Sequence, residues 1–317
     1  MDAIIEAARA KESPVPAITF VLVDRDDHLV YARSYGAIDP TQRLAVASAS
    51  KMVSGLALFG VIGQGQLSLD STTGQVLGWP APKDQITLKH LLSFTSGLPQ
   101  DPSCTSDGDI TLAACVDQIA AMPLEASPGT EFAYGSSHLH VAARMAEVAT
   151  GKPWATIFDE RVRLPLGLPA EVAYFTAPRQ ALGVTNPLIA GGLRASTDEY
   201  TKILGAIFHR GVGLGVPDAL FTAQTKEPFQ VAISSSPVNG IGVDFHYGLT
   251  AWLECDTPMT GCATISSPGT FGFTPWLDRD TGYYAILGME LKKPGSGKFS
   301  VPLQQSLKPA IAAALGE

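Results

Sequence analysis

The chain has 317 residues, of which 45% are apolar and 16% charged, and its formal net charge is −8 at pH 7. This composition predicts a compact protein with a large core and excludes a disordered chain. The acidic residues are scattered, no Lys/Arg-rich helix is present, and no apolar run reaches 18 residues. We therefore expect no nucleic-acid partner and no membrane insertion.

Apolar periodicity predicts the elements in chain order. A helix over residues 2–12 is followed by a hairpin of strands at 17–23 and 29–35. Helices dominate the middle of the chain, over the ranges 48–62, 87–94, 111–122, 137–150, 154–162 and 197–209. Antiparallel strands follow at 247–253, 263–266 and 283–289, before a closing helix over 301–315.

This order predicts an α+β fold in which one antiparallel sheet is built from both ends of the chain. Helices from the N- and C-termini flank the sheet, and a helical domain is inserted into it. We expect residues 1–47 and 230–317 to form the sheet domain. Residues 48–229 would form the mainly helical domain, with the active site at the junction of the two.

The segment Ser48-Ala49-Ser50-Lys51 stands at the start of the most apolar predicted helix. If the helix begins at Ser48, the Ser48 and Lys51 side chains lie on one face, one turn apart. Burying a lysine there costs several kcal/mol or shifts it toward its neutral form, roughly as for any unpaired interior charge. A hydroxyl nucleophile beside a neutral amine is a pattern typical of covalent catalysis.

Four cysteines occur as two close pairs, Cys104 with Cys115 and Cys255 with Cys262, both in polar, turn-like sequence. Neither pair has metal-ligand spacing, so we expect no metal and no cofactor. Two local disulfides are favoured over four free or buried thiols. They would place the protein in the periplasm or outside the cell, with a leader removed ahead of Met1, and a cytoplasmic protein is the alternative.

Several ordered motifs make the chain resemble the serine β-lactamase and penicillin-binding-protein superfamily, closest to class C β-lactamases and family VIII carboxylesterases. The first is Ser48-Ala-Ser-Lys51. The others are Leu91-Leu-Ser-Phe-Thr-Ser-Gly-Leu98, Tyr134-Gly-Ser136, Ala190-Gly-Gly-Leu193 and Ser267-Pro-Gly269 followed by Thr270. The resemblance covers almost the whole chain and implies a β-lactamase/transpeptidase-like fold.

The resemblance also implies the roles of the site residues. Ser48 would be the nucleophile, Lys51 its base and Tyr134 a proton relay, with the amides of Ser48 and Thr270 as the oxyanion hole. A second set of residues would contact the substrate: Ser136, Ser267, Gly269 and, beyond the third motif, Trp276. Each has a structural alternative, since Ser136 can hold a turn, Gly269 can admit close backbone contact and Trp276 can pack in a core. His138 and His140 are expected at the surface or in a helix cap.

Two departures from the family pattern bear on the substrate. Ser136 stands where an Asn commonly contacts a substrate amide, and Ser267-Pro268 replaces a Lys-Thr pair that binds a substrate carboxylate. A hydrolase of small esters, a carboxylesterase, is therefore favoured. An amidase, D-aminopeptidase or weak β-lactamase is the second hypothesis, and a non-catalytic ligand-binding or acylation-only protein is the third. The sequence does not indicate an oligomeric state.

Overall fold

The computed structural model describes residues 1–176, 181–238, 245–291 and 295–316, and its centre is a seven-stranded antiparallel sheet. The strand order is β2-β1-β12-β11-β10-β9-β8. The strands are β1 (Ile18–Asp24), β2 (Leu29–Tyr35), β8 (His246–Tyr247), β9 (Trp252–Leu253), β10 (Thr264–Ser266), β11 (Thr274–Asp278) and β12 (Tyr283–Gly288). Both ends of the chain thus supply the sheet, which confirms the predicted α+β fold.

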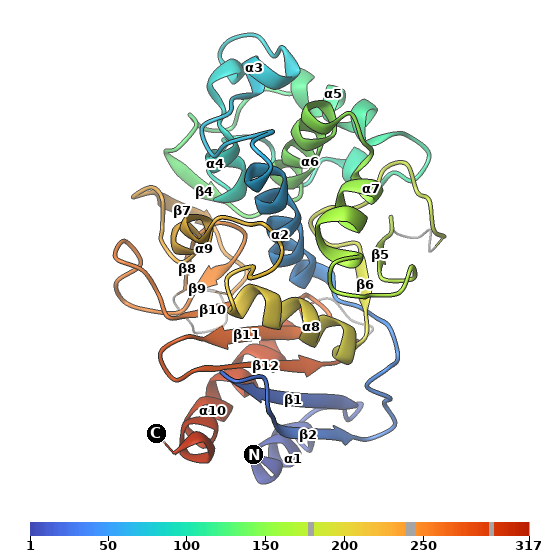
Figure 1. The fold of residues 1–317 in the computed structure, drawn as a ribbon, viewed down its shortest axis with the longest axis vertical. Coiled ribbons are helices and arrows are strands. Elements are labelled where there is room, and N and C mark those ends of the chain that lie inside the picture. The colour runs from blue at the N-terminus through green and yellow to red at the C-terminus, as the bar shows by residue number, and fades with distance from the viewer. Residues whose placement is uncertain (177–180, 239–244, 292–294, 317) are drawn as a thin grey trace.

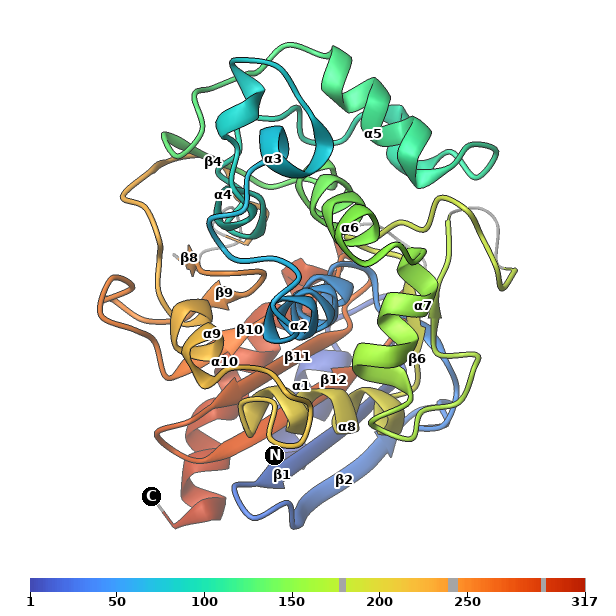
Figure 2. The same ribbon diagram turned by 45° about the horizontal axis from the view of Figure 1, so that its top comes forward.

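Helices cover both faces of this sheet and form a separate block at one end (Figures 1 and 2). The α-helices are α1 (Asp2–Arg9), α2 (Ser50–Gly63), α3 (Thr73–Leu77), α4 (Leu88–Leu92), α5 (Leu112–Ala121), α6 (Ser137–Thr150), α7 (Trp154–Phe158), α8 (Thr197–Phe208), α9 (Asp218–Gln224) and α10 (Gly297–Leu315). Single turns of 3-10 helix occupy Ala47–Ala49, Lys83–Gln85 and Ser103–Ser106, and a π-turn at Asp159–Arg163 extends α7.

Strand β1 shows how the two sides of the sheet are filled. It is buried along most of its length, and its side chains alternate between two cores. Phe20 and Leu22 join a core with α1 and α10, whereas Val21 and Val23 join the larger core that includes α2 and α8. Helix α8 packs on the sheet (Figure 2) although it falls within the range predicted for the helical domain, 48–229, so that division stays a prediction.

Two short sheets fasten segments that carry the motifs. In the first, β6 (Leu193–Ala195) lies between β3 (Leu44–Ala45) and β5 (Ala173–Tyr174), all antiparallel. In the second, β4 (Glu131–Ala133) runs parallel to β7 (Ala232–Ser235). The residues just before Ser48 and just before Tyr134 are therefore held by strand pairing.

The predicted strand 247–253 is wrong in detail, because the structure has a tight hairpin there. β8 ends at Tyr247 and β9 begins at Trp252, with Thr250 in a left-handed conformation at φ +61°. Gly248 lies so close to the Gln224 carbonyl that a Cβ would collide with it. The continuous apolar run gives no sign of this turn. Strand β11 is not among the strands predicted from the sequence, and it contains Pro275, a residue that is unusual inside a strand.

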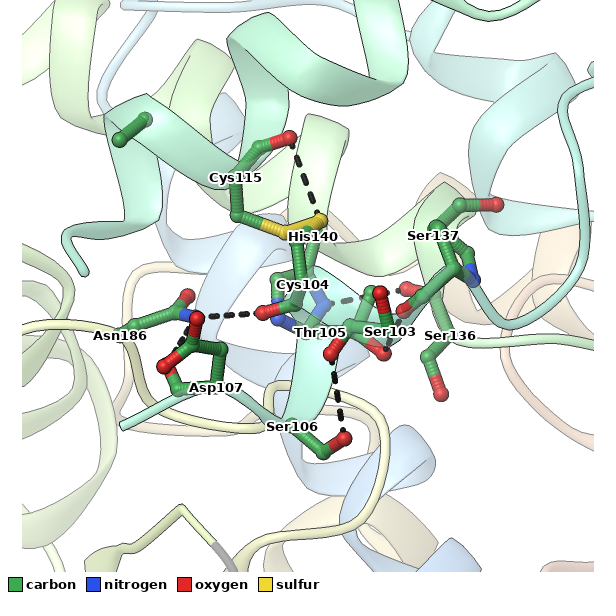
Figure 3. Close-up of a disulfide and its surroundings, with 12 residues drawn as sticks. Ser103, Cys104, Thr105, Ser106, Asp107, Cys115, Ser136, Ser137, His140 and Asn186 are labelled. Atoms are coloured by element: carbon green, nitrogen blue, oxygen red, sulfur yellow. Dashed lines mark hydrogen bonds between the residues drawn. A yellow bond between two sulfur atoms is a disulfide. The ribbon is translucent and has the colours of Figure 1, made fainter. Parts of the chain in front are cut away.

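Two disulfides are present, Cys104–Cys115 and Cys255–Cys262, as the polar, turn-like sequence around each pair predicts. The first ties the 3-10 turn at Ser103–Ser106 to α5 (Figure 3). Asn186 donates from Nδ2 to the carbonyls of Cys104 and Asp107, each at 2.8 Å. The loop is thus anchored from two distant parts of the chain.

The helices in the described part of the chain are either too short or too polar to cross a lipid bilayer.

The close packing of α2 gives a test of the fold. Gly55 lies against the turn before β9, where a Cβ would collide with Thr250 Oγ1 and lie 3.1 Å from Thr250 Cβ. Alanine normally stabilises a helix by roughly 1 kcal/mol over glycine, but overpacking costs about 1–3 kcal/mol. We expect Gly55→Ala to lower the free energy of unfolding by about 1–3 kcal/mol in urea denaturation.

The control is Gly297→Ala in α10, where no atom lies within 4 Å of the added Cβ. This variant should keep the wild-type stability. A Gly55→Ala protein as stable as the wild type would show that α2 does not pack on this turn.

Candidate active site

Ser48 and Lys51 lie at the buried start of α2, as their spacing predicts. Ser48 is in the 3-10 turn Ala47–Ala49, and Lys51 is in the first turn of the α-helix. Lys51 Nζ donates to Ser48 Oγ at 2.9 Å and to the carbonyl of Ala190 at 2.9 Å. Ala47, directly before Ser48, has φ +48°, a conformation that costs a non-glycine residue of order 1–3 kcal/mol and clusters at functional sites.

Burial decides the charge of Lys51. Only 4% of the residue is exposed, because α2 is apolar on nearly every face. Desolvation lowers the pKa of Lys51 to about 7, while the carboxylate of Asp101 acts in the opposite direction. A large fraction of the amine is therefore neutral near pH 7, and a neutral amine can accept the Ser48 proton.

Tyr134 follows β4 and places its ring beside the lysine. Lys51 Nζ lies 4.5 Å from the centre of the Tyr134 ring. Trp252 stacks on the same ring at 5.2 Å between centroids. Burial raises the pKa of the Tyr134 hydroxyl, and interactions with the Ser48 and Trp252 side chains oppose that rise. The phenol is protonated at neutral pH, so Lys51 is the better candidate for the first base.

The second motif is held by the disulfide-braced loop. The backbone N–H of Ser136 donates to the Gln100 carbonyl at 2.8 Å and to the Asp101 carboxylate at 2.9 Å. Gly135 passes so close to Gln100 that a Cβ would collide with its backbone. Figure 3 shows Ser136 and His140 beside Cys104 and Cys115. The loop therefore fixes the backbone that leads from Tyr134 into α6.

The third motif, after β10, reaches the nucleophile from the far end of the chain. Ser267 donates from Oγ to the Ser48 carbonyl at 2.9 Å and is 2% exposed. Gly269 approaches Val46 so closely that a Cβ would collide with its carbonyl oxygen. Both residues fasten the strand to the turn of Ser48. The structure thus gives Ser267 a bracing contact where the sequence suggested a substrate contact.

A cavity of about 400 Å³ opens at these residues. Ser48, Lys51, Ser136 and Thr270 line it together with the apolar side chains Phe175, Leu188 and Phe271. The exposed Thr270 accepts hydrogen bonds on its carbonyl and on Oγ1, from Ser296 and Gly295. The structure therefore brings Ser48, Lys51, Ser136 and Thr270 to one cavity, with the Tyr134 ring against Lys51.

Trp276 is not in this cavity, which corrects the expectation that it contacts the substrate. It is fully buried on the opposite face of the sheet, stacked on Phe20 at 6.1 Å, and its Nε1 donates to the Tyr283 hydroxyl at 3.2 Å. Side chains alternate along β11, so a tryptophan six residues beyond Thr270 need not share its side. Trp252 of β9 is the tryptophan that contacts Tyr134.

His138 and His140 are buried, which rules out the first of their two expected places, the surface, while both lie in the first turns of α6. His138 bridges Ser96 Oγ and the Ala133 carbonyl, each at 2.8 Å, and stacks on Phe94 at 4.9 Å. Desolvation lowers the pKa of each histidine to about 4, so both are neutral. His138 thereby supports the backbone next to Tyr134, a role that the sequence pattern did not reveal.

One group of metal-capable side chains occurs among the described residues, Asp24, Asp26 and His28 in the turn after β1. Asp24 Oδ1 already accepts the backbone N–H groups of Asp26 and His28 at 2.9 Å. These contacts account for the group as an ordinary turn, away from the cavity.

Comparisons with known proteins identify the family of the chain. A sequence model of the Beta-lactamase family matches residues 5–299, and the chain therefore belongs to this family. Esterase EstB of Burkholderia gladioli is 26% identical over 383 residues, covering 99% of this chain and 94% of EstB. Penicillin-binding protein 4 of Amycolatopsis lactamdurans is 30% identical over 188 residues, covering 56% of this chain and 49% of that protein.

The solved structures give the same fold. A Bacteroides dorei protein assigned as a beta-lactamase superimposes with a TM-score of 0.84 at 26% identity, covering 98% of this chain and 97% of that one. Family membership and the full-length similarity to an esterase identify the chain as a hydrolase.

The lowered pKa of Lys51 predicts a pH-dependent stability. The unfolded chain keeps the lysine proton up to its ordinary pKa of 10.5, whereas the folded chain releases it near 7. Between these values the unfolded state binds more protons, so raising the pH stabilises the folded state. Relative to Lys51→Met, the wild type should gain up to about 1.4 kcal/mol per pH unit in urea unfolding between pH 7 and 9.

Lys89→Met is the matched control, because it removes a partly exposed lysine that pairs with Asp70. It should run parallel to the wild type over the same range. Parallel curves for the wild type and Lys51→Met would contradict the lowered pKa.

Proposed function

We propose that the protein is a carboxylesterase that hydrolyses small esters through a covalent acyl-enzyme on Ser48. The observation that carries this proposal is the 2.9 Å contact between Lys51 Nζ and Ser48 Oγ, at a lysine whose pKa is lowered to about 7. A serine hydroxyl needs an adjacent base to attack a carbonyl, and a Ser-Lys pair is an alternative to Ser-His-Asp.

The first half-reaction forms the ester on Ser48. Neutral Lys51 takes the hydroxyl proton as Oγ attacks the carbonyl carbon of the substrate. The negative charge that develops on the carbonyl oxygen is accepted by the backbone N–H groups of Ser48 and Thr270. The carbon–oxygen bond to the alcohol then breaks, and the alcohol leaves with the proton that Tyr134 relays from Lys51.

The second half-reaction hydrolyses the acyl-enzyme and regenerates free Ser48. A water molecule gives its proton to the Lys51–Tyr134 pair and attacks the acyl carbon. The carboxylic acid leaves as Ser48 Oγ regains its proton. The contact between the Lys51 amine and the Tyr134 ring, 4.5 Å from nitrogen to ring centre, supports the relay.

The third motif supports an ester over a β-lactam or peptide substrate. Ser267 and Pro268 carry no charge, and the Ser267 hydroxyl is engaged by the Ser48 carbonyl. No cation of this motif is therefore present to bind the carboxylate of a β-lactam or a peptide. The full-length relative EstB is an esterase, which agrees with this choice.

The two disulfides support a location outside the reducing cytoplasm, in the periplasm or the medium. Cys104–Cys115 braces the loop next to Ser136, and Cys255–Cys262 closes the turn between β9 and β10.

Turnover of a substrate panel tests the proposed reaction. Wild type and Ser48→Ala are assayed with 4-nitrophenyl esters, a chromogenic cephalosporin and D-amino-acid amides, with Ser106→Ala as an exposed serine control. We expect ester turnover in the wild type and the control, and a fall of roughly 10³-fold or more in Ser48→Ala. Ester turnover that survives in Ser48→Ala contradicts the mechanism.

The same panel separates the alternatives. Preferred turnover of amides would favour an amidase or D-aminopeptidase, and preferred turnover of the cephalosporin a β-lactamase. A stable adduct of Ser48 in intact-mass spectrometry, with no turnover, would favour an acylation-only protein.

The pH profile tests the base. Since neutral Lys51 is the reactive form, kcat/KM for a neutral ester should rise about tenfold per pH unit below 7 and level off above it. Lys51→Arg keeps the positive charge at all these pH values and should lose roughly 10³-fold or more in kcat/KM. A profile that is flat from pH 5 to 8 would show that Lys51 is not the base.

A further inference from the structure

Besides Lys51, the cavity wall carries two charged side chains that the proposed mechanism does not use. Arg194 lies on β6, and Glu290 is the second residue after β12. They are almost 100 residues apart in sequence, and their side chains are 20% and 26% exposed. Half-buried charges beside a ligand cavity cost desolvation and call for a reason.

The position of Arg194 is rigid. β6 is the central strand of its three-stranded sheet, and Arg194 pairs with Ala45 on one side and with Ala173 on the other. The same segment also holds the proposed base, because the Ala190 carbonyl accepts a hydrogen bond from Lys51 Nζ. Arg194 lies four residues after Ala190, a span of at most about 14 Å, so its backbone is within a small substrate's length of the carbonyl that holds Lys51.

Among the described residues, the Glu290 carboxylate has a hydrogen-bond donor besides Arg194, whereas the charged group next to the Arg194 side chain is Glu290. Glu290 Oε2 accepts the backbone N–H of Ala45 at 2.9 Å and is fixed by it. Its distance to Arg194 is 3.6 Å, an ion pair longer than a hydrogen bond. A guanidinium has five N–H donors in a fixed fork that matches a carboxylate. The cavity therefore presents a pre-positioned cation whose donors a ligand can fill.

We infer that Arg194 is a specificity-determining residue, and that the substrate carries a carboxylate at the end of its acyl or alcohol part, remote from the scissile ester. This inference rests on the proposed function and names its substrate class. The apolar Phe175, Leu188 and Phe271 would hold the chain between the ester and the carboxylate. Arg194 would thus supply a cation that the third motif lacks, at a different place in the site.

The position of Glu290 predicts in which direction each substitution should change the preference for acidic esters. In the free enzyme its carboxylate is the anion next to Arg194, so it competes with an acidic substrate. Removing the Arg194 charge should weaken selection for acidic esters, and removing the Glu290 charge should strengthen it. A substrate with an ammonium group would show the reverse dependence, with selection lost on removal of Glu290.

Matched esters measure this selection. The acyl series compares mono-4-nitrophenyl esters of adipic and suberic acid with 4-nitrophenyl hexanoate and octanoate. The alcohol series compares 3-carboxy-4-nitrophenyl butyrate with 4-nitrophenyl butyrate. The readout is the ratio of kcat/KM for the acidic ester to that for its neutral partner, in wild type, Arg194→Gln and Glu290→Gln, each checked for folding by its melting temperature.

We expect the ratio to fall about 10- to 100-fold in Arg194→Gln in at least one series, the usual range for losing a hydrogen bond to a charged group. It should rise in Glu290→Gln. The control Arg144→Gln, which breaks a surface pair with Glu147, should keep the wild-type ratio. Ratios unchanged by Arg194→Gln in both series overturn the inference, and so does an ammonium-bearing ester favoured only while Glu290 is present.

A failure of the proposed function is distinguishable from a failure of this inference. If the wild type hydrolyses no ester, binding replaces turnover as the readout. Calorimetric titration of monoethyl adipate into Ser48→Ala should then give an affinity that falls about 10-fold or more in Ser48→Ala/Arg194→Gln. Equal affinities, or no binding to either protein, overturn the inference.

Discussion

The contact between Lys51 and Ser48 is the constraint on which the site depends. The Lys51 amine loses its charge near neutral pH because water is kept away from it, and α2 achieves this by being buried along most of its length. The same burial makes the helix a poor place for a polar group unless it is satisfied. Lys51 is satisfied by Ser48 and by the Ala190 carbonyl, so burial and hydrogen bonding together keep the nucleophile and its base in register.

Segments far apart in sequence converge to keep that contact in place. The strand from the C-terminal region fixes the turn through Ser267, and the β6 segment accepts from the lysine. The disulfide-braced loop holds the second motif through Gln100 and Asp101. The geometry of the site lowers the stability of the fold, because the left-handed Ala47 and the buried lysine both cost free energy that the surrounding packing must offset.

The sequence predicted the parts of the fold and the site that depend on local pattern. Helix spacing placed Ser48 next to Lys51. The apolar run of strand β1 was sufficient to predict the hairpin, and the polar, turn-like sequence around the cysteine pairs was sufficient to predict the disulfides. It failed where long-range packing decides. Trp276 and Trp252 are both apolar strand residues, and only the assembled sheet shows which of them faces Tyr134. The pairing of Arg194 with Glu290 likewise has no signature along the chain.

The central claim is that Lys51 has a pKa near 7 beside Ser48, so that about half of the amine is neutral at pH 7. Titration of Lys51 by NMR, in protein with carbon-13 at the lysine ε-position and with the signal assigned through Lys51→Met, tests it most directly. The account predicts a midpoint near pH 7. A midpoint close to the ordinary value of about 10.4 would contradict it, because the amine would then be an ammonium unable to accept the Ser48 proton.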